Sequence, residues 1–428
     1  MKIINDKQKA LQELNRITSR TASEKNNEIN KIVEQILEAV KNDGDLAVKQ
    51  YTEKFDGFIP DPMQVSENEL KDAWNGIDSN LKRSLEIAHE RIKIFHENEI
   101  PTSFTLKGKY GDSVQRRWNP VKKAGIYIPG GRAAYPSTVL MNAIPAKVAG
   151  VKEITMVSPG NKKGQINKTV LAAAHLSGIN KVFRIGGAQA IGALAFGTNQ
   201  INKVDVISGP GNIYVTTAKK LIYGITGIDS LAGPSEILII ADKTAKSSQI
   251  ASDLLAQAEH DPLASSILLT TSHEQAEEVH DEIYKTINYH PRKEICLQSI
   301  KNWGLIVICE NYETCIELSN NFAPEHLEII TFNSKEILKG IENAGAIFLG
   351  KWTPEAVGDY LAGPNHTLPT SGNSRFSGSL GVETFMKNTS IIEFTEESLK
   401  FNSLDIINLA NSEGLHSHAN SVKIRFED

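Results

Sequence analysis

The chain is poor in cysteine, and this scarcity limits the chemistry that it can use. Cys296, Cys309 and Cys315 are its only cysteines in 428 residues, and none of them has CxxC spacing. Three thiols without such spacing argue against a disulfide framework and fit a reducing cytoplasm. Cys309 ends the apolar run 305–308, where a small buried side chain is the ordinary interpretation. We therefore expect a cytoplasmic protein that does not depend on a catalytic thiol.

Long apolar runs and an excess of positive charge are also missing. No stretch approaches the roughly 18 apolar residues of a transmembrane helix. Residues 1–20 mix Lys, Asp, Glu and Gln and lack the apolar centre of a signal peptide. The formal net charge of -5 gives no reason to expect an affinity for nucleic acid or for an anionic membrane. We expect neither nucleic acid nor a membrane among the partners.

What the chain does contain is a regular alternation of short apolar runs and helical patterns. The first series of apolar runs comprises 125–128, 154–157, 182–185 and 204–207. The second comprises 236–240, 267–270, 305–308 and 346–349, with helical patterns at 247–260 and 273–286. This alternation predicts an α/β fold with parallel sheets covered by helices, and the length of 428 residues predicts two or more domains. The region 24–98 is predicted to be helical.

Two short polar segments carry the residue types that metal-assisted proton transfer needs. Gln257 and His260 are three residues apart near the end of a predicted helix, so both project from one face. Glu325 and His326 are adjacent, just after a proline and before an apolar strand. Together they offer nitrogen and oxygen ligands for a divalent ion and two proton carriers. Taken alone, the first pair is more simply a solvated helix face, and a polar surface loop explains the second pair equally well.

Glycines cluster at the ends of three predicted strands of the first series. They occur in Pro129-Gly130-Gly131, Gly186-Gly187-Ala188-Gln189 and Gly209-Pro210-Gly211-Asn212. Loops at the carboxyl ends of parallel strands are where such sheets bind ligands, and glycine lets the backbone approach a phosphate. The usual GxGxxG fingerprint is absent, and a single glycine loop is more often just a tight turn. Three such loops around one sheet favour a nucleotide that is held in a non-standard way.

Further ligands for a metal site would have to come from distant segments, where the candidates are Asp359 and the histidines at 416 and 418. At this point the chain resembles the histidinol dehydrogenase family, in motif order, spacing and length, over essentially its whole extent. The motifs that carry the resemblance are Tyr127-Ile128-Pro129-Gly130-Gly131, Gly209-Pro210-Gly211-Asn212, Leu231-Ala232-Gly233-Pro234-Ser235-Glu236, Leu254 to His260, Ala323-Pro324-Glu325-His326-Leu327, Gly358-Asp359-Tyr360, Gly363-Pro364-Asn365-His366-Thr367-Leu368-Pro369-Thr370 and Glu413-Gly414-Leu415.

The resemblance implies one Zn²⁺ per subunit and a pair of catalytic residues. The zinc ligands would be Gln257, His260, Asp359 and His418, a set of nitrogens and oxygens that suits Zn²⁺. Glu325 and His326 would be the catalytic pair. His418 is chosen for its spacing from Glu413; in a shifted register, His416 would be the ligand instead.

The same resemblance implies which residues hold the cofactor and the substrate. NAD would be held by Tyr127, Gln189 and Asn212. L-histidinol would be contacted by the four zinc ligands, by the catalytic histidine and by three further residues, Ser235, His366 and Glu413.

The resemblance also implies two incomplete Rossmann-like domains with helical extensions at both ends. The expected division is an N-terminal helical extension at 1–25, a zinc and substrate domain at 26–126 and 235–380, an NAD-binding domain at 127–234, and a C-terminal helical tail at 381–428. The tail would reach the partner subunit of an intertwined homodimer, so that each active site is shared between subunits.

The implied reaction is the zinc-dependent, NAD-linked, four-electron oxidation of L-histidinol to L-histidine through L-histidinal, which ends histidine biosynthesis. One alternative is a related zinc- and NAD-dependent dehydrogenase of another small amino alcohol or diol. Another is a metal-held dimeric binding protein without catalysis, although binding alone would need neither of the proton carriers Glu325 and His326.

Overall fold

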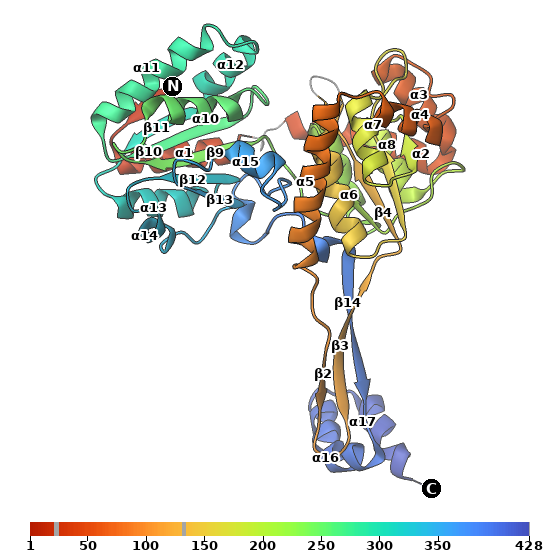
Figure 1. Ribbon diagram of the computed structural model, residues 1–428. Helices are drawn as coiled ribbons and strands as arrows, with labels where there is room; N and C mark the ends of the chain where they lie inside the picture. Colours follow the sequence, from red (N-terminus) through yellow and green to blue (C-terminus); the bar gives the residue numbers. More distant parts are fainter. Residues whose placement is uncertain (21–24, 131–133, 428) are drawn as a thin grey trace. The chain divides into compact units, whose positions relative to one another are not determined.

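The structure, a computed structural model, describes residues 1–20, 25–130 and 134–427. Within these ranges the chain forms two parallel sheets and one antiparallel sheet, drawn in Figure 1. Gly131 of the expected glycine loop, and residues 21–24 of the expected N-terminal extension, lie outside the described residues. The chain divides into a first unit, Met1–Glu99 with Lys122–Phe385, and a second unit, Ile100–Val121 with Met386–Asp428. The predicted α/β class with parallel sheets is confirmed.

The five-stranded sheet of the first unit has the order β6-β5-β4-β7-β8, and all its strands are parallel. Its strands are β4 (Lys123–Tyr127), β5 (Glu153–Val157), β6 (Lys181–Phe183), β7 (Val206–Ser208) and β8 (Gly227–Ile228). The helices that alternate with them are α6 (Pro136–Val148), α7 (Lys168–Leu176), α8 (Gly187–Phe196) and α9 (Ile213–Ile222). Strands β4 to β7 follow the predicted series because each is a short run of mainly buried apolar residues that the helices cover, whereas β8, whose two residues are only partly buried, was not predicted.

Four of the helices that precede this sheet along the chain are α2 (Lys25–Asp43), α3 (Asp45–Asp56), α4 (Glu67–Asn75) and α5 (Ser79–Glu97). The start of α4 is fixed by a capping box between Ser66 and Glu69. On α2, Val33, Ile36 and Val40 form the apolar stripe that enters the core of the five-stranded sheet.

The six-stranded sheet has the order β1-β11-β10-β9-β12-β13, and all its strands are parallel. Its strands are β1 (Lys2–Ile4), β9 (Glu236–Ala241), β10 (Ser265–Thr270), β11 (Gly304–Ile308), β12 (His326–Ile330) and β13 (Ala346–Leu349). Its helices are α1 (Lys7–Thr18), α10 (Ser247–Ala258), α11 (His273–Ile287), α12 (Lys293–Trp303), α13 (Tyr312–Phe322), α14 (Ser334–Leu338) and α15 (Glu355–Tyr360). Two short 3₁₀ turns, Asn373–Arg375 and Val382–Phe385, end the unit.

Strand β9 lies inside this sheet, and its side chains alternate between two cores. Ile237 and Ile239 pack with apolar residues of α10, α11 and α12. Leu238 and Ile240 pack with apolar residues of α1, α13 and α14. Because side chains of a strand point alternately to opposite faces, a sheet with helices on both faces needs a continuous apolar strand. The run Glu236–Ala241 meets that requirement and carries one buried carboxylate at its first position.

The described residues differ from the expected domain division in three places. Helices α2 and α3 bury their apolar residues with Tyr127 and Phe183, so the segment 26–56 packs on the five-stranded sheet and not on the six-stranded one. Residues 2–4 are the edge strand β1 of the six-stranded sheet, so the N-terminal segment is more than a helical extension. The segment 386–393 is a strand, so the C-terminal tail is not wholly helical.

The second unit is built from two segments that are far apart in the sequence. Its antiparallel sheet has the order β14-β3-β2, with β2 (Phe104–Lys107), β3 (Ser113–Pro120) and β14 (Met386–Glu393). Two helices, α16 (Glu396–Ser412) and α17 (His416–Lys423), and a 3₁₀ turn, Ile424–Phe426, follow β14. The hydroxyl of Thr395 donates to the carbonyl of Tyr110 at 2.6 Å, which joins the turn between β2 and β3 to the start of α16. No described helix is long and apolar enough to cross a membrane.

Candidate active site

Glu325 and His326 lie where α13 gives way to β12. Helix α13 ends at Ala323, whose φ of 52° turns the chain, and Pro324 prevents the helix from continuing. The two side chains that follow are almost completely buried, with 7% and 4% of their residue surface exposed. The surface-loop interpretation of this pair is therefore wrong, because both groups lie inside the six-stranded domain.

Both side chains bind the main chain of Glu236, the first residue of β9. The Glu236 N–H donates to Oε2 of Glu325 at 2.8 Å. The Glu236 carbonyl lies 3.0 Å from Nδ1 of His326. Since a carbonyl oxygen can only accept, Nδ1 carries the proton, and Nε2 of His326 is left as the basic nitrogen.

The pKa values of Glu325 and His326 are shifted in opposite directions. Burial, and then the negative charge of Glu236, raises the pKa of Glu325 well above its usual value. Burial lowers the pKa of His326. The imidazole therefore stays neutral and able to accept a proton at a pH where an ordinary histidine would begin to be protonated. The carboxyl group needs a higher pH than usual to become a base.

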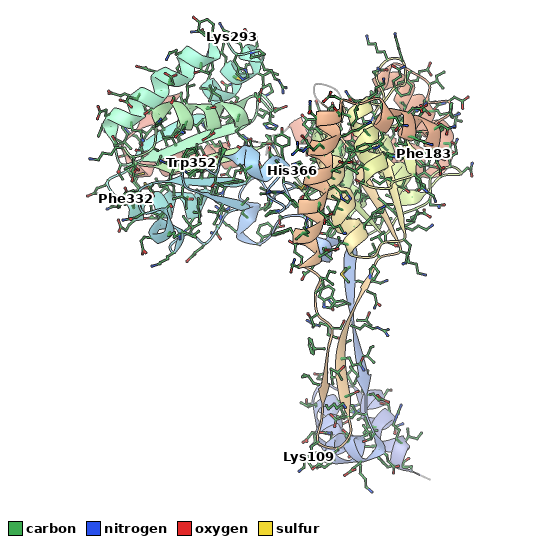
Figure 2. The ribbon with its side chains drawn as sticks, in the orientation of Figure 1. Lys109, Phe183, Lys293, Phe332, Trp352 and His366 are labelled. Atoms are coloured by element: carbon green, nitrogen blue, oxygen red, sulfur yellow. The ribbon has the colours of Figure 1, made fainter. Side chains whose placement is uncertain are left out.

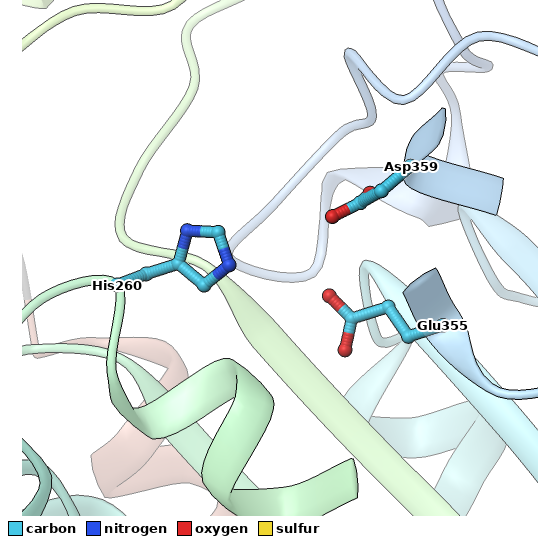
Figure 3. A group of neighbouring side chains, drawn as sticks. All are labelled: His260, Glu355 and Asp359. Atoms are coloured by element: carbon cyan, nitrogen blue, oxygen red, sulfur yellow. The ribbon is translucent and has the colours of Figure 1, made fainter. Parts of the chain in front are cut away.

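A possible metal site lies beside this pair. Figure 3 shows the side chain of His260, from the turn after α10, pointing toward those of Glu355 and Asp359, which both lie on α15. Their ligand atoms all lie within 4.8 Å of one another. Nitrogen and carboxylate oxygen atoms converging in this way fit Zn²⁺ or a similar divalent ion. Sequence analysis expected His260 and Asp359 here but missed Glu355.

Gln257 lies just before His260 on the chain and is completely buried. Its Nε2 is 3.3 Å from Nδ1 of His326, while its Oε1 has no hydrogen-bond partner among the described residues. A buried amide oxygen without a partner is costly, unless a group that is added later satisfies it. The interpretation as a solvated helix face is thus wrong for Gln257. Helix α10 also ends at Ala258, earlier than predicted, so His260 lies in the turn that follows.

Glu355 reaches the site from the first residue of α15. Its Oε1 lies 3.6 Å from Nδ1 of His326, and its Oε2 has no hydrogen-bond partner within the described ranges. The main-chain N–H of Glu355 donates to Oε1 of Glu328 at 2.8 Å, so a buried carboxyl of β12 fixes the start of α15. A spacing of four residues puts Glu355 and Asp359 on the same face of this helix, which is the signal that could have identified Glu355.

Of the three further residues expected at the substrate, Ser235 and His366 lie in the first unit. His366 is on the segment after α15, and it is labelled in Figure 2. Its Nδ1 lies 3.1 Å from the carbonyl of Asp359, and its Nε2 lies 3.4 Å from the hydroxyl of Thr138. Burial lowers the pKa of His366, which keeps the ring neutral. Ser235 directly precedes Glu236, and its carbonyl accepts from Ser265 at 3.0 Å.

The residues expected at NAD lie at the carboxyl ends of strands in the five-stranded sheet or begin the helices that follow. The hydroxyl of Tyr127 accepts from the N–H of Gly187 at 3.2 Å, and burial raises the pKa of Tyr127 to about 12. Gln189 is buried in the first turn of α8, and neither polar atom of its side chain has a partner among the described residues. Asn212 caps α9 by accepting from Tyr214 and Val215.

The glycine loop after β7 is fixed by a buried ion pair. Asp229 accepts from the N–H of Gly209 at 2.8 Å, and Lys219 donates to the carbonyl of Gly209 at 3.0 Å and to Asp229. The φ of Gly209 is +111°, and a Cβ at this position would lie 2.1 Å from the carbonyl oxygen of Tyr127. Only glycine can occupy this position, so the close approach of two strand ends depends on it.

The remaining predicted site residues lie in the second unit. Glu413 directly follows α16 as its C-cap, and His418 lies on α17; both are exposed. His416 is the first residue of α17, and its Nδ1 lies 3.4 Å from the side-chain oxygen of Asn411. The assignment of His418 rather than His416 as a ligand stays a prediction.

Comparison with known proteins gives one consistent result. A family model described as histidinol dehydrogenase matches residues 19–426. The chain is 84% identical to a histidinol dehydrogenase of Prochlorococcus marinus (strain MIT 9312), over all of this chain and 97% of that protein. It is 81% identical to another from Prochlorococcus marinus subsp. pastoris, with both chains covered completely.

A solved structure agrees with these sequence relatives. The crystal structure of histidinol dehydrogenase from Elizabethkingia anophelis is 37% identical and has a TM-score of 0.89, covering 93% of this chain and 92% of that one. A family match over nearly the whole length, relatives above 80% identity and a shared fold lead to one assignment: the chain belongs to the histidinol dehydrogenase family.

Proposed function

We propose that this chain oxidises L-histidinol to L-histidine through L-histidinal, with two NAD⁺ consumed, in the last steps of histidine biosynthesis. As a member of its family the chain is an oxidoreductase. The observation that carries the proposal is the buried pair of Glu325 and His326 beside the converging side chains of His260, Glu355 and Asp359. Two proton carriers next to a set of metal ligands are what a dehydrogenation followed by a hydration requires.

Zn²⁺ fits the residues that are present. Gln257, His260 and Asp359 supply an amide oxygen, an imidazole nitrogen and a carboxylate oxygen, and the partnerless Oε1 of Gln257 would gain a partner. Glu355 adds a second carboxylate, and His418 would complete the set. Bound zinc would orient the amine and imidazole of the substrate, and NAD⁺ would accept the hydride in each oxidation.

His326 is suited to remove the hydroxyl proton in the first oxidation. Its Nδ1 is committed to the Glu236 carbonyl, so Nε2 takes the proton from the alcohol while the hydride leaves the same carbinol group. The product is an aldehyde. The neutral state that burial gives His326 matches this role, because a protonated imidazole could not act as a base.

Glu325 is suited to the hydration that follows. Its carboxylate takes a proton from a water molecule whose oxygen attacks the aldehyde carbon, which gives a gem-diol. His326 then removes a hydroxyl proton from the gem-diol as the second hydride leaves, and the carboxylic acid forms. This sequence needs no thiol, which agrees with three cysteines that are all buried. Their free thiols also support our proposal of a cytoplasmic setting.

The remaining residues would bind the ligands. We propose that Tyr127, Gln189 and Asn212 hold NAD, supported by the glycine loops that surround them. Ser235 and His366 would contact the substrate in the same subunit. Glu413 and His418 would reach the active site of the partner in a homodimer, so each active site would be shared.

The test is the number of NADH molecules formed for each L-histidinol consumed by the purified full-length protein. We expect two NADH, loss of activity after chelation and recovery when zinc is returned. One NADH for each substrate molecule would indicate a simple alcohol dehydrogenase. No NADH with histidinol, but turnover of another small amino alcohol or diol, would contradict the proposed substrate.

A further inference from the structure

Arg20, two residues beyond the end of α1, has a side chain with 0% of its surface exposed. A buried guanidinium is tolerated only when acceptors surround it, because its charge and its N–H groups lose their water. In this structure four oxygen atoms accept hydrogen bonds from the guanidinium of Arg20. Nη1 donates to Oε1 of Glu236 at 2.9 Å and to the carbonyl of Ile17 at 2.8 Å, Nη2 to the carbonyl of Pro234 at 2.8 Å, and Nε to the carbonyl of Leu263 at 2.8 Å.

Glu236, the acidic partner of Arg20, is also the residue that binds both catalytic groups. Its N–H binds the Glu325 carboxyl at 2.8 Å, and its carbonyl binds Nδ1 of His326 at 3.0 Å. A rotation of this one residue would therefore disturb the direction of Glu325 and the ring of His326 together. The catalytic groups are bound by the main chain of Glu236, while its buried carboxylate, whose charge raises the pKa of Glu325, is paired with Arg20.

Arg20 adds a side-chain anchor where the sheet only begins to hold the chain. The ladder of β9 with β10 begins at Glu236, and its ladder with β12 begins one residue later, at Ile237. The carbonyl of Pro234 and the carboxylate of Glu236, on either side of the strand start, are both bound by the same guanidinium. Leu263, whose carbonyl is another of the four acceptors, follows His260 by three residues, so the loop after this proposed metal ligand is joined to the same guanidinium.

We propose that Arg20 is a positioning residue: it holds the start of β9 so that the main chain of Glu236 orients Glu325 and His326. This inference rests on the proposed function, which makes Glu325 and His326 the catalytic pair. Arginine is required rather than a simple positive charge, because the four acceptors lie around a planar fork that a lysine ammonium cannot span. Misplacing a catalytic group by a fraction of its contact distance reduces the rate of the chemical step more than it reduces substrate binding.

The test uses Arg20→Lys in the full-length protein, since this substitution keeps a positive charge beside Glu236. We expect kcat to fall by about 10- to 100-fold, with the KM values for histidinol and NAD⁺ within about twofold of wild type and with bound zinc unchanged. Arg16→Lys is the matched control, because Arg16 lies on α1 with 43% of its side chain exposed and pairs with Glu13. An unchanged kcat in Arg20→Lys, or a loss of activity that follows loss of zinc, would overturn the proposal.

A second readout does not depend on activity, so failure of this inference can be told from failure of the proposed function. In protein labelled with ¹⁵N-histidine, the hydrogen-bonded Nδ1–H signal of His326 is assigned by its loss in His326→Gln. We expect the signal to shift or broaden in Arg20→Lys and not in Arg16→Lys; an unmoved signal contradicts the inference whatever the substrate is. Should Arg20→Lys fail to fold, Arg20→Met with Glu236→Met, which removes both charges of the buried pair, is judged by the same outcomes.

Discussion

At the scale of single residues, the candidate site is marked by polar atoms that are buried without partners. Oε1 of Gln257 and Oε2 of Glu355 have no hydrogen-bond partner in the described part of the chain. An unsatisfied buried polar group typically costs about 1–3 kcal/mol. Both atoms are beside residues with metal-ligand chemistry, so the same atoms that weaken the empty protein would stabilise the loaded one.

Gln257→Leu should separate these two effects. We expect the zinc-free protein to be as stable as wild type or more stable by about 1 kcal/mol, because an unsatisfied amide is replaced by an apolar group. Zinc should raise the Tm of wild type but not that of the variant. Calorimetry after chelation and after zinc return measures both effects, with Gln249→Leu on the same helix as the control. A variant Tm that still rises with zinc would show that Gln257 is not a ligand.

Glu325 should set the acid side of the pH profile. Its raised pKa means that the carboxylate appears only at a higher pH than for an ordinary glutamate, so activity rises with pH as the base forms. Glu325→Gln should lower the overall rate by roughly 10²- to 10⁴-fold and remove this dependence. Steady-state rates across pH provide the measurement, and the exposed Glu313→Gln serves as the control. An acid limb that persists in Glu325→Gln would assign it to another group.

The residue pairs in the two polar segments were predictable from sequence, but their surroundings were not. Glu325, His326, Gln257 and His260 stand close together on the chain, so their spacing reveals them. Arg20 and Glu236 are separated by more than two hundred residues, and nothing local to either indicates a partner. Glu355 was missed because a glutamate after a proline is ordinary at a helix start, where it needs no further explanation.

At the scale of elements, β12 and α15 are joined by a hydrogen bond, and together they position the carboxyl groups of the candidate site. His326 and Glu328 are two residues apart on β12 and so point to the same face of the sheet. The side chain of Glu328 accepts a hydrogen bond from the first N–H of α15, the helix that carries Glu355 and Asp359. Burial, and then the negative charge of Asp253, raises the pKa of Glu328 well above its usual value. A carboxyl oxygen can accept this hydrogen bond in either protonation state.

Glu328→Gln and Glu328→Leu should therefore differ. The amide retains an oxygen acceptor for the N–H of Glu355, so zinc affinity should stay close to that of wild type. The leucine leaves the start of α15 without its acceptor, and we expect zinc affinity to fall by about 10- to 100-fold. Competition with a chelating dye gives both affinities. Equal affinities in the two variants would mean that the placement of α15 does not depend on Glu328.

The regular elements of the parallel sheets were predictable, whereas the antiparallel sheet was not. Strands such as β9 and β10 are continuous apolar runs because both their faces are buried. Every residue of β2 is exposed, and the alternation of Phe104 and Leu106 with polar residues extends over only four residues, so it does not stand out in the sequence. The edge strand β1 has only three residues, too few for any periodicity to be visible.

At the scale of the whole molecule, the proposed shared active site gives a test by subunit mixing. Glu325→Gln and His418→Ala chains should each be inactive as homodimers. After dissociation and random reassociation, each mixed dimer should contain one intact site, so about a quarter of wild-type activity should return. Activity assays together with a measurement of heterodimer content provide the result. Mixed dimers that form and remain inactive would contradict sharing in trans, and Glu325→Gln mixed with His416→Ala tests the alternative register.

The division of the whole chain was harder to predict than its parts. The apolar residues of 26–56 are the only sign in the sequence of where this segment packs. Such residues can pack on either parallel sheet. The preference of Val33 and Val40 for the core around Ile191 and Leu194 depends on shapes that one sequence does not reveal. Sequence motifs therefore predict the catalytic and binding residues more readily than they predict which sheet a helix packs against.

The two neighbours of β3, the central strand of the antiparallel sheet, are translated at very different times. β3 pairs with β2 as soon as that hairpin leaves the ribosome, but its other edge is covered only by β14, which is translated after almost the whole of the first unit. Throughout most of its synthesis the nascent protein therefore carries an open strand edge, which is a site for wrong pairing between neighbouring chains on one messenger. Chaperones that bind this hairpin during translation would therefore raise the yield of active enzyme more than chaperones that act after the chain has left the ribosome.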